Sequence, residues 1–325
     1  MFKHLSLKIL TMFPQIMVIT LIVFFISNHM MFSGTQAGEE GARPLFNASL
    51  GQLESIQELF HHLTRPVQDY FYWLGNVLRG EWGRSARWQR PVIDILSWRL
   101  YNTLSLSVLA LLMMYALAVP AAIISAKNQG KLKDHVLTAL SYVGFAVPMF
   151  IFTLFAMYVF AFRLGWFPSR GSVPPGMSSE QAGYWFARFH HMILPAFCIA
   201  AVTMAPIFHY LKTEMVQVGG QPMVVTARSK GCSESRVYSK HIFRNSLLPV
   251  TTSFGYQLAA LFGGTIFVEM LFSYPGMGGL LLTALEDGDQ AVMAAVILLY
   301  SLATIIGSCL SEVLTAWVDP RIRIK

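Results

Sequence analysis

Six long apolar stretches constrain this sequence more than any other feature. Each holds about 20 or more predominantly apolar residues, the length that an α-helix needs to cross the hydrocarbon core of a bilayer. Backbone groups in lipid must be hydrogen-bonded within the protein, so the stretches predict an all-α integral membrane protein with six transmembrane helices. The approximate windows are 8–27, 102–126, 136–162, 192–211, 247–272 and 291–317.

The composition agrees with this class of protein. The 325 residues are 54% hydrophobic and 13% charged, whereas soluble domains carry about 25% charged residues. The N-terminus is basic and then apolar, which could mark a cleaved signal peptide. Its long apolar core favours an uncleaved first helix instead. The cysteines, Cys198, Cys232 and Cys309, lack metal-like spacing and predict neither a disulfide framework nor a metal site.

The distribution of charge predicts the orientation of the helices. A net charge of +7 could suit a nucleic-acid binder, but the basic residues gather between apolar windows. They precede the first window, fill 127–133, follow the fourth window and end the chain, whereas the loop 285–290 is acidic. The positive-inside rule therefore predicts cytoplasmic termini, and we expect membrane lipid, not nucleic acid, around the chain.

These boundaries divide the chain into three parts. We expect a first transmembrane helix over 1–30 and an extracytoplasmic segment over 31–101. The core domain, 102–325, would then hold five transmembrane helices and a cytoplasmic loop over 213–246.

A basic segment, residues 222–249, lies between the fourth and fifth windows and reads PMVVTARSKGCSESRVYSKHIFRNSLLP. Pro222 can begin a helix, Gly231 interrupts the helical pattern, and Ser233 suits the N-cap of a second helix. Basic side chains recur every four residues on one face of that second helix, namely at Arg236, Lys240 and Arg244. The segment could rest on anionic lipid headgroups or dock on a partner protein, and its composition leaves both alternatives open.

Motifs spread from about residue 75 to the end carry a family resemblance. In the basic segment they are Thr-Ala-Arg-x-Lys-Gly at 226–231, with His241, Arg244-Asn245 and Leu248-Pro249. Elsewhere they are GRSARWQRPVIDILSWRLYNTL (83–104), SYVGFAVPMF (141–150), RLGWFPSRG (163–171), VEMLFSYPGMGGLL (268–281) and DPRIR (319–323). Together they resemble the permeases of ATP-binding-cassette (ABC) importers, in the dipeptide, oligopeptide and nickel branch. Between 31 and 63 the match is poor.

The resemblance implies a type I ABC importer permease fold in the bacterial cytoplasmic membrane. It also implies a complex with a second permease, two cytosolic ABC ATPases and an extracytoplasmic substrate-binding protein. ATP and Mg would be bound by the ATPases, and this chain would carry no cofactor. The basic segment would contain the coupling helix that contacts one ATPase. The residues assigned to ATPase coupling are Thr226, Ala227, Arg228, Lys230, Gly231, Arg236, Lys240, His241, Arg244, Asn245 and Pro249.

Enzymatic functions are disfavoured by missing motifs. The sequence has no G-x-x-x-x-G-K-[ST] phosphate loop, so we predict that the chain does not hydrolyse ATP. It also lacks H-E-x-x-H and G-x-S-x-G, and no catalytic residue is assigned. A self-contained secondary carrier or channel is the alternative, although no convincing inverted repeat supports it. Peptides are the favoured substrates, with nickel or other metal chelates and glutathione-like compounds as alternatives.

Polar residues inside apolar windows are candidates for the translocation pathway, because their burial in lipid is costly. Ser253 and Gln257 are four residues apart on the fifth window, and Thr203 lies on the fourth. Pro148 is added from the third window. For Gln257 a hydrogen bond between helices is an equal alternative. Residues near the outer end of the fifth window are assigned to an outer gate or to structure, namely Glu269, Pro275, Gly276 and Gly278.

Overall fold

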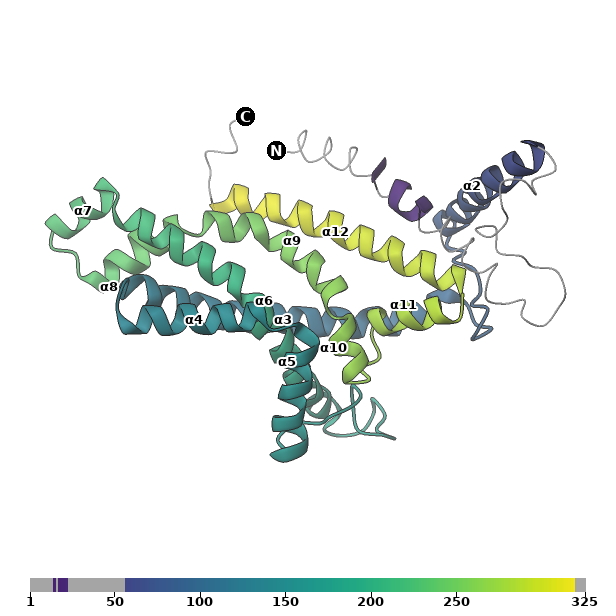
Figure 1. Cartoon of the computed structure of the whole chain (residues 1–325), viewed down its shortest axis with the longest axis horizontal. Coiled ribbons are helices and arrows are strands. Elements are labelled where there is room, and N and C mark those ends of the chain that lie inside the picture. Colours follow the sequence, from purple (N-terminus) through teal and green to yellow (C-terminus); the bar gives the residue numbers. More distant parts are fainter. Residues whose placement is uncertain (1–13, 16, 23–55, 319–325) are drawn as a thin grey trace. The chain divides into compact units, whose positions relative to one another are not determined.

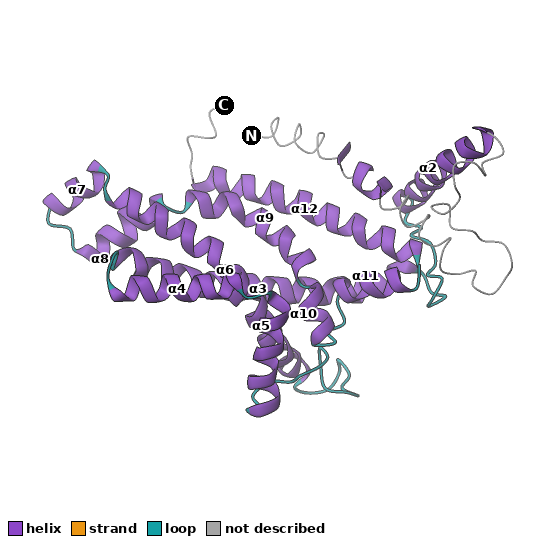
Figure 2. Ribbon diagram, viewed as in Figure 1, coloured by secondary structure: helices purple, strands orange, loops and turns teal. Residues whose placement is uncertain are grey.

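The structure is a computed structural model that describes residues 14–15, 17–22 and 56–318. The predicted first transmembrane helix therefore lies largely outside the described residues, as do the segment 31–55 and the tail from 319. The described chain is helical (Figure 2), apart from loops and one isolated bridge between Arg84 and Pro91. Labelled as in Figure 1, the elements are α2 (Ile56–Leu78), α3 (Val92–Lys127), α4 (Leu132–Ala146), α5 (Met149–Ala156), η2 (Met157–Arg163), α6 (Tyr184–Gly219), α7 (Pro222–Ser229), α8 (Glu234–Arg236), η3 (Val237–Phe243), α9 (Leu248–Gly264), α10 (Ile266–Leu271), α11 (Met277–Glu286) and α12 (Gln290–Val318).

Three of the described helices, α3, α6 and α12, are each long and apolar enough to cross a membrane. They contain the second, fourth and sixth predicted windows. Pro120, Pro195 and Pro206 all lie inside α3 or α6 without ending them. The fifth window divides into α9 and α10, which are separated at Thr265.

The third window differs from the continuous helix that we expected. α4 and the α5–η2 helix are long and apolar enough to cross a membrane only when taken together, and the two are bent by 105° relative to each other. Val147 ends α4 in an extended conformation, and Pro148 follows at the start of α5. A residue before proline disfavours the α conformation, and proline has no N–H to continue the ladder. These two local effects disfavour a continuous helix at this position.

The chain divides into two compact units. Among the described residues, the larger comprises 102–279 and 306–318, and the smaller comprises those up to 101 together with 280–305. In the larger unit α6 packs against α4, α5, α9, α10 and η3. Its buried side chains, including Ile199, Phe208 and Leu211, form the core with Leu106 and Met114 of α3. α6 is therefore the central helix of this unit.

Two glycines bring α9 close to the end of α12. A Cβ added to Gly255 would lie 1.6 Å from the carbonyl oxygen of Gly307, so neither position has room for a larger residue. One turn further along α12, the Ser311 hydroxyl donates a 2.9 Å hydrogen bond to the carbonyl oxygen of Thr251. Small residues permit this close backbone approach, which is a common way for membrane helices to associate.

In the smaller unit, polar contacts hold the turn after α2 to the loop before α12. The Ser85 hydroxyl donates a 2.5 Å hydrogen bond to Asp289, and Arg87 pairs with Asp287. Asp289 also accepts a hydrogen bond from the backbone N–H of Val292, in the first turn of α12. A single carboxylate thus caps α12 and fixes the preceding turn.

Candidate functional site

The basic segment begins as a short helix that ends in a defined turn. Gln221 is extended and Pro222 occupies the first turn of α7, where its missing N–H costs nothing. At the other end Gly231 has φ +77°, its N–H donates to Arg228 O, and the Cys232 N–H donates to Ala227 O. These bonds form a Schellman motif, which stops a helix and requires a left-handed residue that glycine provides. The predicted break at Gly231 therefore has a specific geometry.

The second half of the segment is not the regular α-helix that we expected. Ser233 has the extended backbone of an N-cap, but its side chain makes no capping hydrogen bond. A short α8 then passes into η3, a π-helix from Val237 to Phe243. Insertions of π-helix in α-helices are rare and often mark functional sites.

The two faces of this half still separate charge from apolar surface. Val237 and Ile242 are fully buried in the core of the larger unit. The three basic residues predicted to share a face are exposed, as is Asn245. Three more residues of the segment are exposed, namely Thr226, Arg228 and Lys230. Ala227 is buried and His241 is half-buried. The side chain of Pro249 is outside what the structure describes.

An ion pair crosses the turn at Gly231. Arg228 of α7 donates hydrogen bonds of 2.8 and 3.2 Å to the two carboxylate oxygens of Glu234 in α8. The hydrogen bond from Arg228 lowers the pKa of Glu234, and the same bond raises the pKa of Arg228. Both side chains are largely exposed, so the pair orients the two halves more than it stabilises them.

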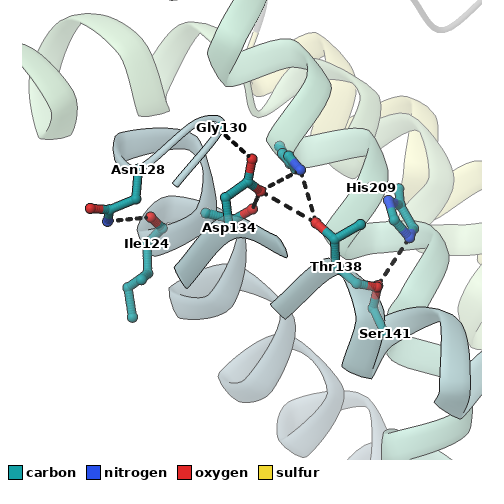
Figure 3. A network of polar contacts seen from close by, with 9 residues as sticks. Ile124, Asn128, Gly130, Asp134, Thr138, Ser141 and His209 are labelled. Atoms are coloured by element: carbon teal, nitrogen blue, oxygen red, sulfur yellow. Dashed lines mark hydrogen bonds and ion pairs between the residues drawn. The ribbon is translucent and has the colours of Figure 1, made fainter. Parts of the chain in front are cut away.

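The turn between α3 and α4 is tied to α6 by a buried charge network (Figure 3). The Asp134 carboxylate lies 2.5 Å from Nζ of Lys212 and accepts hydrogen bonds from the Ser125 hydroxyl and the Gly130 N–H. Lys212 also donates a 2.9 Å hydrogen bond to the Thr138 hydroxyl. Asp134 is 5% exposed, so its charge requires these partners.

The same turn also reaches the basic segment. Nζ of Lys127, the last residue of α3, lies 5.0 Å from the centre of the Tyr238 ring in η3. A cation at this distance from an aromatic face is attracted to it. The turn between α3 and α4 therefore contacts both α6 and η3, which lie before and after α7 in the chain.

Two of the candidate pathway residues, Ser253 and Gln257, contact each other, whereas Thr203 makes a separate contact. Gln257 accepts a 2.9 Å hydrogen bond from the Tyr115 hydroxyl of α3 and donates one of 3.2 Å to Ser253. The Tyr115 ring also stacks on Phe254. The Thr203 hydroxyl donates to the carbonyl of Ile199 in its own helix. Gln257 thus makes the interhelical bond that we named as its alternative role, and a place on the pathway stays a prediction for all four residues.

Glu269 and the residues assigned with it come together around one buried carboxylate. Glu269 is 1% exposed and accepts hydrogen bonds from the Thr103 and Thr265 hydroxyls, at 2.7 and 3.1 Å. Its second oxygen accepts the N–H groups of Gly278 and Gly279 at the start of α11. Negative charge is favoured at a helix N-terminus, where unpaired N–H groups point outward.

A second link holds the turn before α11. Asn102 donates a 2.7 Å hydrogen bond to the carbonyl of Pro275 and accepts one of 2.6 Å from Arg188. A Cβ on Gly276 would lie 2.2 Å from the Glu269 carboxylate, so only glycine fits there. The turn is therefore fixed on α3 and α6. Whether it opens and closes as an outer gate stays a prediction.

Sequence reasoning missed the residues that complete these networks. Asp134, Tyr115, Asn102 and Arg188 were not singled out, although each is a polar residue in or beside an apolar window. Polar residues are scarce in these windows and usually find partners there, so their presence alone could have marked these four residues for attention. Among the described residues, no group of three or more His, Cys, Asp or Glu side chains could hold a metal.

Comparison with known proteins places these features in a family. The model of the family described as binding-protein-dependent transport system inner membrane component matches residues 118–324, more than half of the chain. The chain belongs to this family of ABC transporter permeases. The predicted family, the transport function and the bacterial inner membrane as location are thereby confirmed. The permease has no ATPase activity or cofactor of its own and works with ATPase partners.

Relatives of this permease cover most or all of its length. It is 36% identical over 254 residues to the oligopeptide transport system permease protein AppB of Bacillus subtilis, covering 78% of this chain and 79% of the relative. It is 30% identical over 329 aligned positions to the glutathione transport system permease protein GsiC of Escherichia coli K12, covering 100% of both. It is also 34% identical to a putative peptide permease protein of Brucella ovis, covering 80% of each chain.

A solved structure shows the same fold. A chain of the inward-facing MetNI methionine ABC transporter superposes with a TM-score of 0.56 at 13% identity, covering 70% of this chain and 97% of that one. This confirms an all-helical importer permease fold with several apolar spans.

Proposed function

We propose that the chain forms half of the translocation pathway of an ABC importer for oligopeptides. It would pair with a second permease, two cytosolic ATPases and an extracytoplasmic binding protein. The relatives support the substrate class, since they include oligopeptide, peptide and glutathione permeases. Glutathione is itself a small peptide-like thiol, so peptides as a substrate class include what all three relatives are named for. Metal chelates remain the alternative within the family.

The topology is part of the proposal. Six transmembrane helices with both termini in the cytoplasm would place the basic segment and the α3–α4 turn on the ATPase side. The basic residues between the windows support this orientation. The extracytoplasmic segment 31–101 and the turn around Glu269 would then face the binding protein.

One observation carries the coupling role of the basic segment. Its apolar side chains, such as Val237 and Ile242, are buried in the larger unit, while Arg236, Lys240 and Arg244 are exposed. A segment anchored by one face can transmit a rigid-body displacement from a partner bound to the other. The Asp134–Lys212 pair and the Lys127–Tyr238 contact would pass that displacement to α3, α4 and α6.

Affinity purification of the tagged permease from native membranes, with mass spectrometry, tests the composition of the complex. We expect a second permease and ATPases in stoichiometric amounts. Recovery of the intact chain alone would support a self-contained carrier instead.

Charge reversal then tests the coupling face. We expect the double variant Arg236→Glu/Arg244→Glu to lose ATPase subunits or transport while still inserting normally. Lys133→Glu is the matched control, because Lys133 is an exposed lysine of the α3–α4 region outside the basic segment. Equal transport by both variants would refute the assignment of the basic segment to ATPase coupling.

A further inference from the structure

A cavity between α4 and α6 is not used by any role assigned above. Its volume is about 530 Å³, within the range of small-molecule sites in proteins. α4 lines it with Tyr142 and Phe145, and α6 lines it with Pro206, His209, Tyr210 and Glu214. Every one of these residues belongs to the larger unit, so the cavity is complete within it.

Four of the eight residues that line the cavity are aromatic, and three of these four are exposed. Tyr142 is 57% exposed, Phe145 65% and Tyr210 59%. One ring is fixed in place: Nε2 of His209 lies 3.0 Å from the Ser141 hydroxyl, as Figure 3 shows, and its ring centre is 4.5 Å from that of Tyr142. Exposed aromatic faces present the negative side of a ring quadrupole, which attracts cations.

One carboxylate lines the cavity. Glu214 is half-buried, and within the part of the chain that the structure describes its carboxylate makes no hydrogen bond or ion pair. Lys212, two residues away in sequence, is held by Asp134 and Thr138. Glu214 therefore places a carboxylate beside the aromatic rings that line the cavity.

We propose that this cavity binds a primary ammonium group carried on an apolar body. Glu214 would pair with the ammonium group, the tyrosine faces would contact it, and Phe145 and Pro206 would pack on the apolar part. The inference rests on the proposed function and deepens it: the ligand is the free amino end of a transported peptide. Glu214 lies three residues beyond the predicted end of the fourth window, so the site is near the cytoplasmic exit.

Equilibrium binding to the purified transporter in nanodiscs tests this assignment without transport. The probe is tritiated trileucine, compared with N-acetyl-trileucine, which has the same apolar body and no ammonium group. The discs contain phosphatidylglycerol only, because its headgroup has no amine. We expect the free peptide to bind roughly 10- to 150-fold more tightly than the acetylated one, the range that corresponds to one hydrogen bond between charged groups.

Variants locate the preference. In Glu214→Gln the ratio of the two affinities should fall to about one, and in Tyr210→Ala both affinities should fall. Glu180→Gln, which removes an exposed acid from the loop before α6, should bind like wild type. Equal affinities for the two probes in wild type, or a preference that survives in Glu214→Gln, would overturn the proposal.

A lipid amine is the other source of the same chemistry. Adding phosphatidylethanolamine to the discs should leave the preference intact if the ligand is the peptide. If that lipid abolishes the preference, the site belongs to a lipid headgroup and the peptide assignment is wrong. Because the assay needs neither ATP nor uptake, its failure is distinct from a failure to recover the importer complex.

Discussion

Replacing Gly231 tests how the basic segment transmits force. A Cβ at this position would have no other atom within 4 Å, so a larger side chain meets no steric obstacle. The cost comes only from the backbone, whose φ of +77° is unfavourable for L-residues by about 1–2 kcal/mol. That energy corresponds to an approximately 5- to 30-fold shift away from the formed turn. The hydrogen bonds from Gly231 and Cys232 that close α7 would be lost with it.

The matched pair is Gly231→Val and Gly231→Asn. Valine is β-branched and strongly disfavours positive φ, whereas asparagine adopts it several-fold more readily. Both variants would be reconstituted in proteoliposomes with the second permease, the ATPases and the binding protein, and trileucine uptake and phosphate release would be measured together. We expect the peptide transported per ATP hydrolysed to fall by up to about 5- to 30-fold in the valine variant and to stay near wild type in the asparagine variant.

Two results would refute this reasoning. Normal coupling in Gly231→Val would show that the turn geometry does not transmit the ATPase movement. Equal losses in both variants would show that the backbone conformation is not the cause, since only valine excludes it. The amount of each variant in the membrane, measured by immunoblot, separates both results from failed insertion.

Three other perturbations address the networks. Lys212→Met leaves the buried Asp134 charge unpaired and should cost about 3–5 kcal/mol in thermal unfolding, with partial recovery in the double variant Asp134→Asn/Lys212→Met; additive losses would contradict a direct pair. Gly276→Ala should reduce folded yield in size-exclusion chromatography because its Cβ meets the Glu269 carboxylate, whereas Gly279→Ala, with open space at its Cβ, should not; equal yields would contradict the packing. Tyr115→Phe should lower stability to heat by about 0.6–1.7 kcal/mol, and no change would make its bond to Gln257 unimportant.

The helices that the sequence predicts well are those with uniform apolar character. α3, α6 and α12 were expected from length and composition, and prolines inside them did not break them. The sequence did not distinguish the third window, which is broken at Pro148, from these continuous helices. Pro148 and Pro206 have the same local effects on the backbone, but only Pro148 lies at a break. The difference arises from packing: α4 and α5 both pack on α6, so each half has its own contacts.

In the candidate site too, local features could be predicted from the sequence and long-range contacts could not. The break at Gly231 is a local property, and a glycine between two helical patterns predicted it. The bond from Tyr115 to Gln257 and the bond from Thr103 to Glu269 join residues 142 and 166 positions apart, and no local pattern predicted the π-helix η3. A single sequence indicates that such polar groups need partners, but it does not identify them.

The bend at Pro148 has a consequence for the biogenesis of the protein. α4 has 15 residues, and α5 with η2 has 8 and 7. Each half is thus about 22 Å long, which is shorter than the hydrocarbon core of about 30 Å. The translocon would receive one continuous apolar segment, although neither half can cross the bilayer alone. Because the polar backbone at the bend needs protein around it, the final conformation must wait until α6 has been synthesised and inserted. This span therefore reaches its native conformation only after the following helix, α6, has been made.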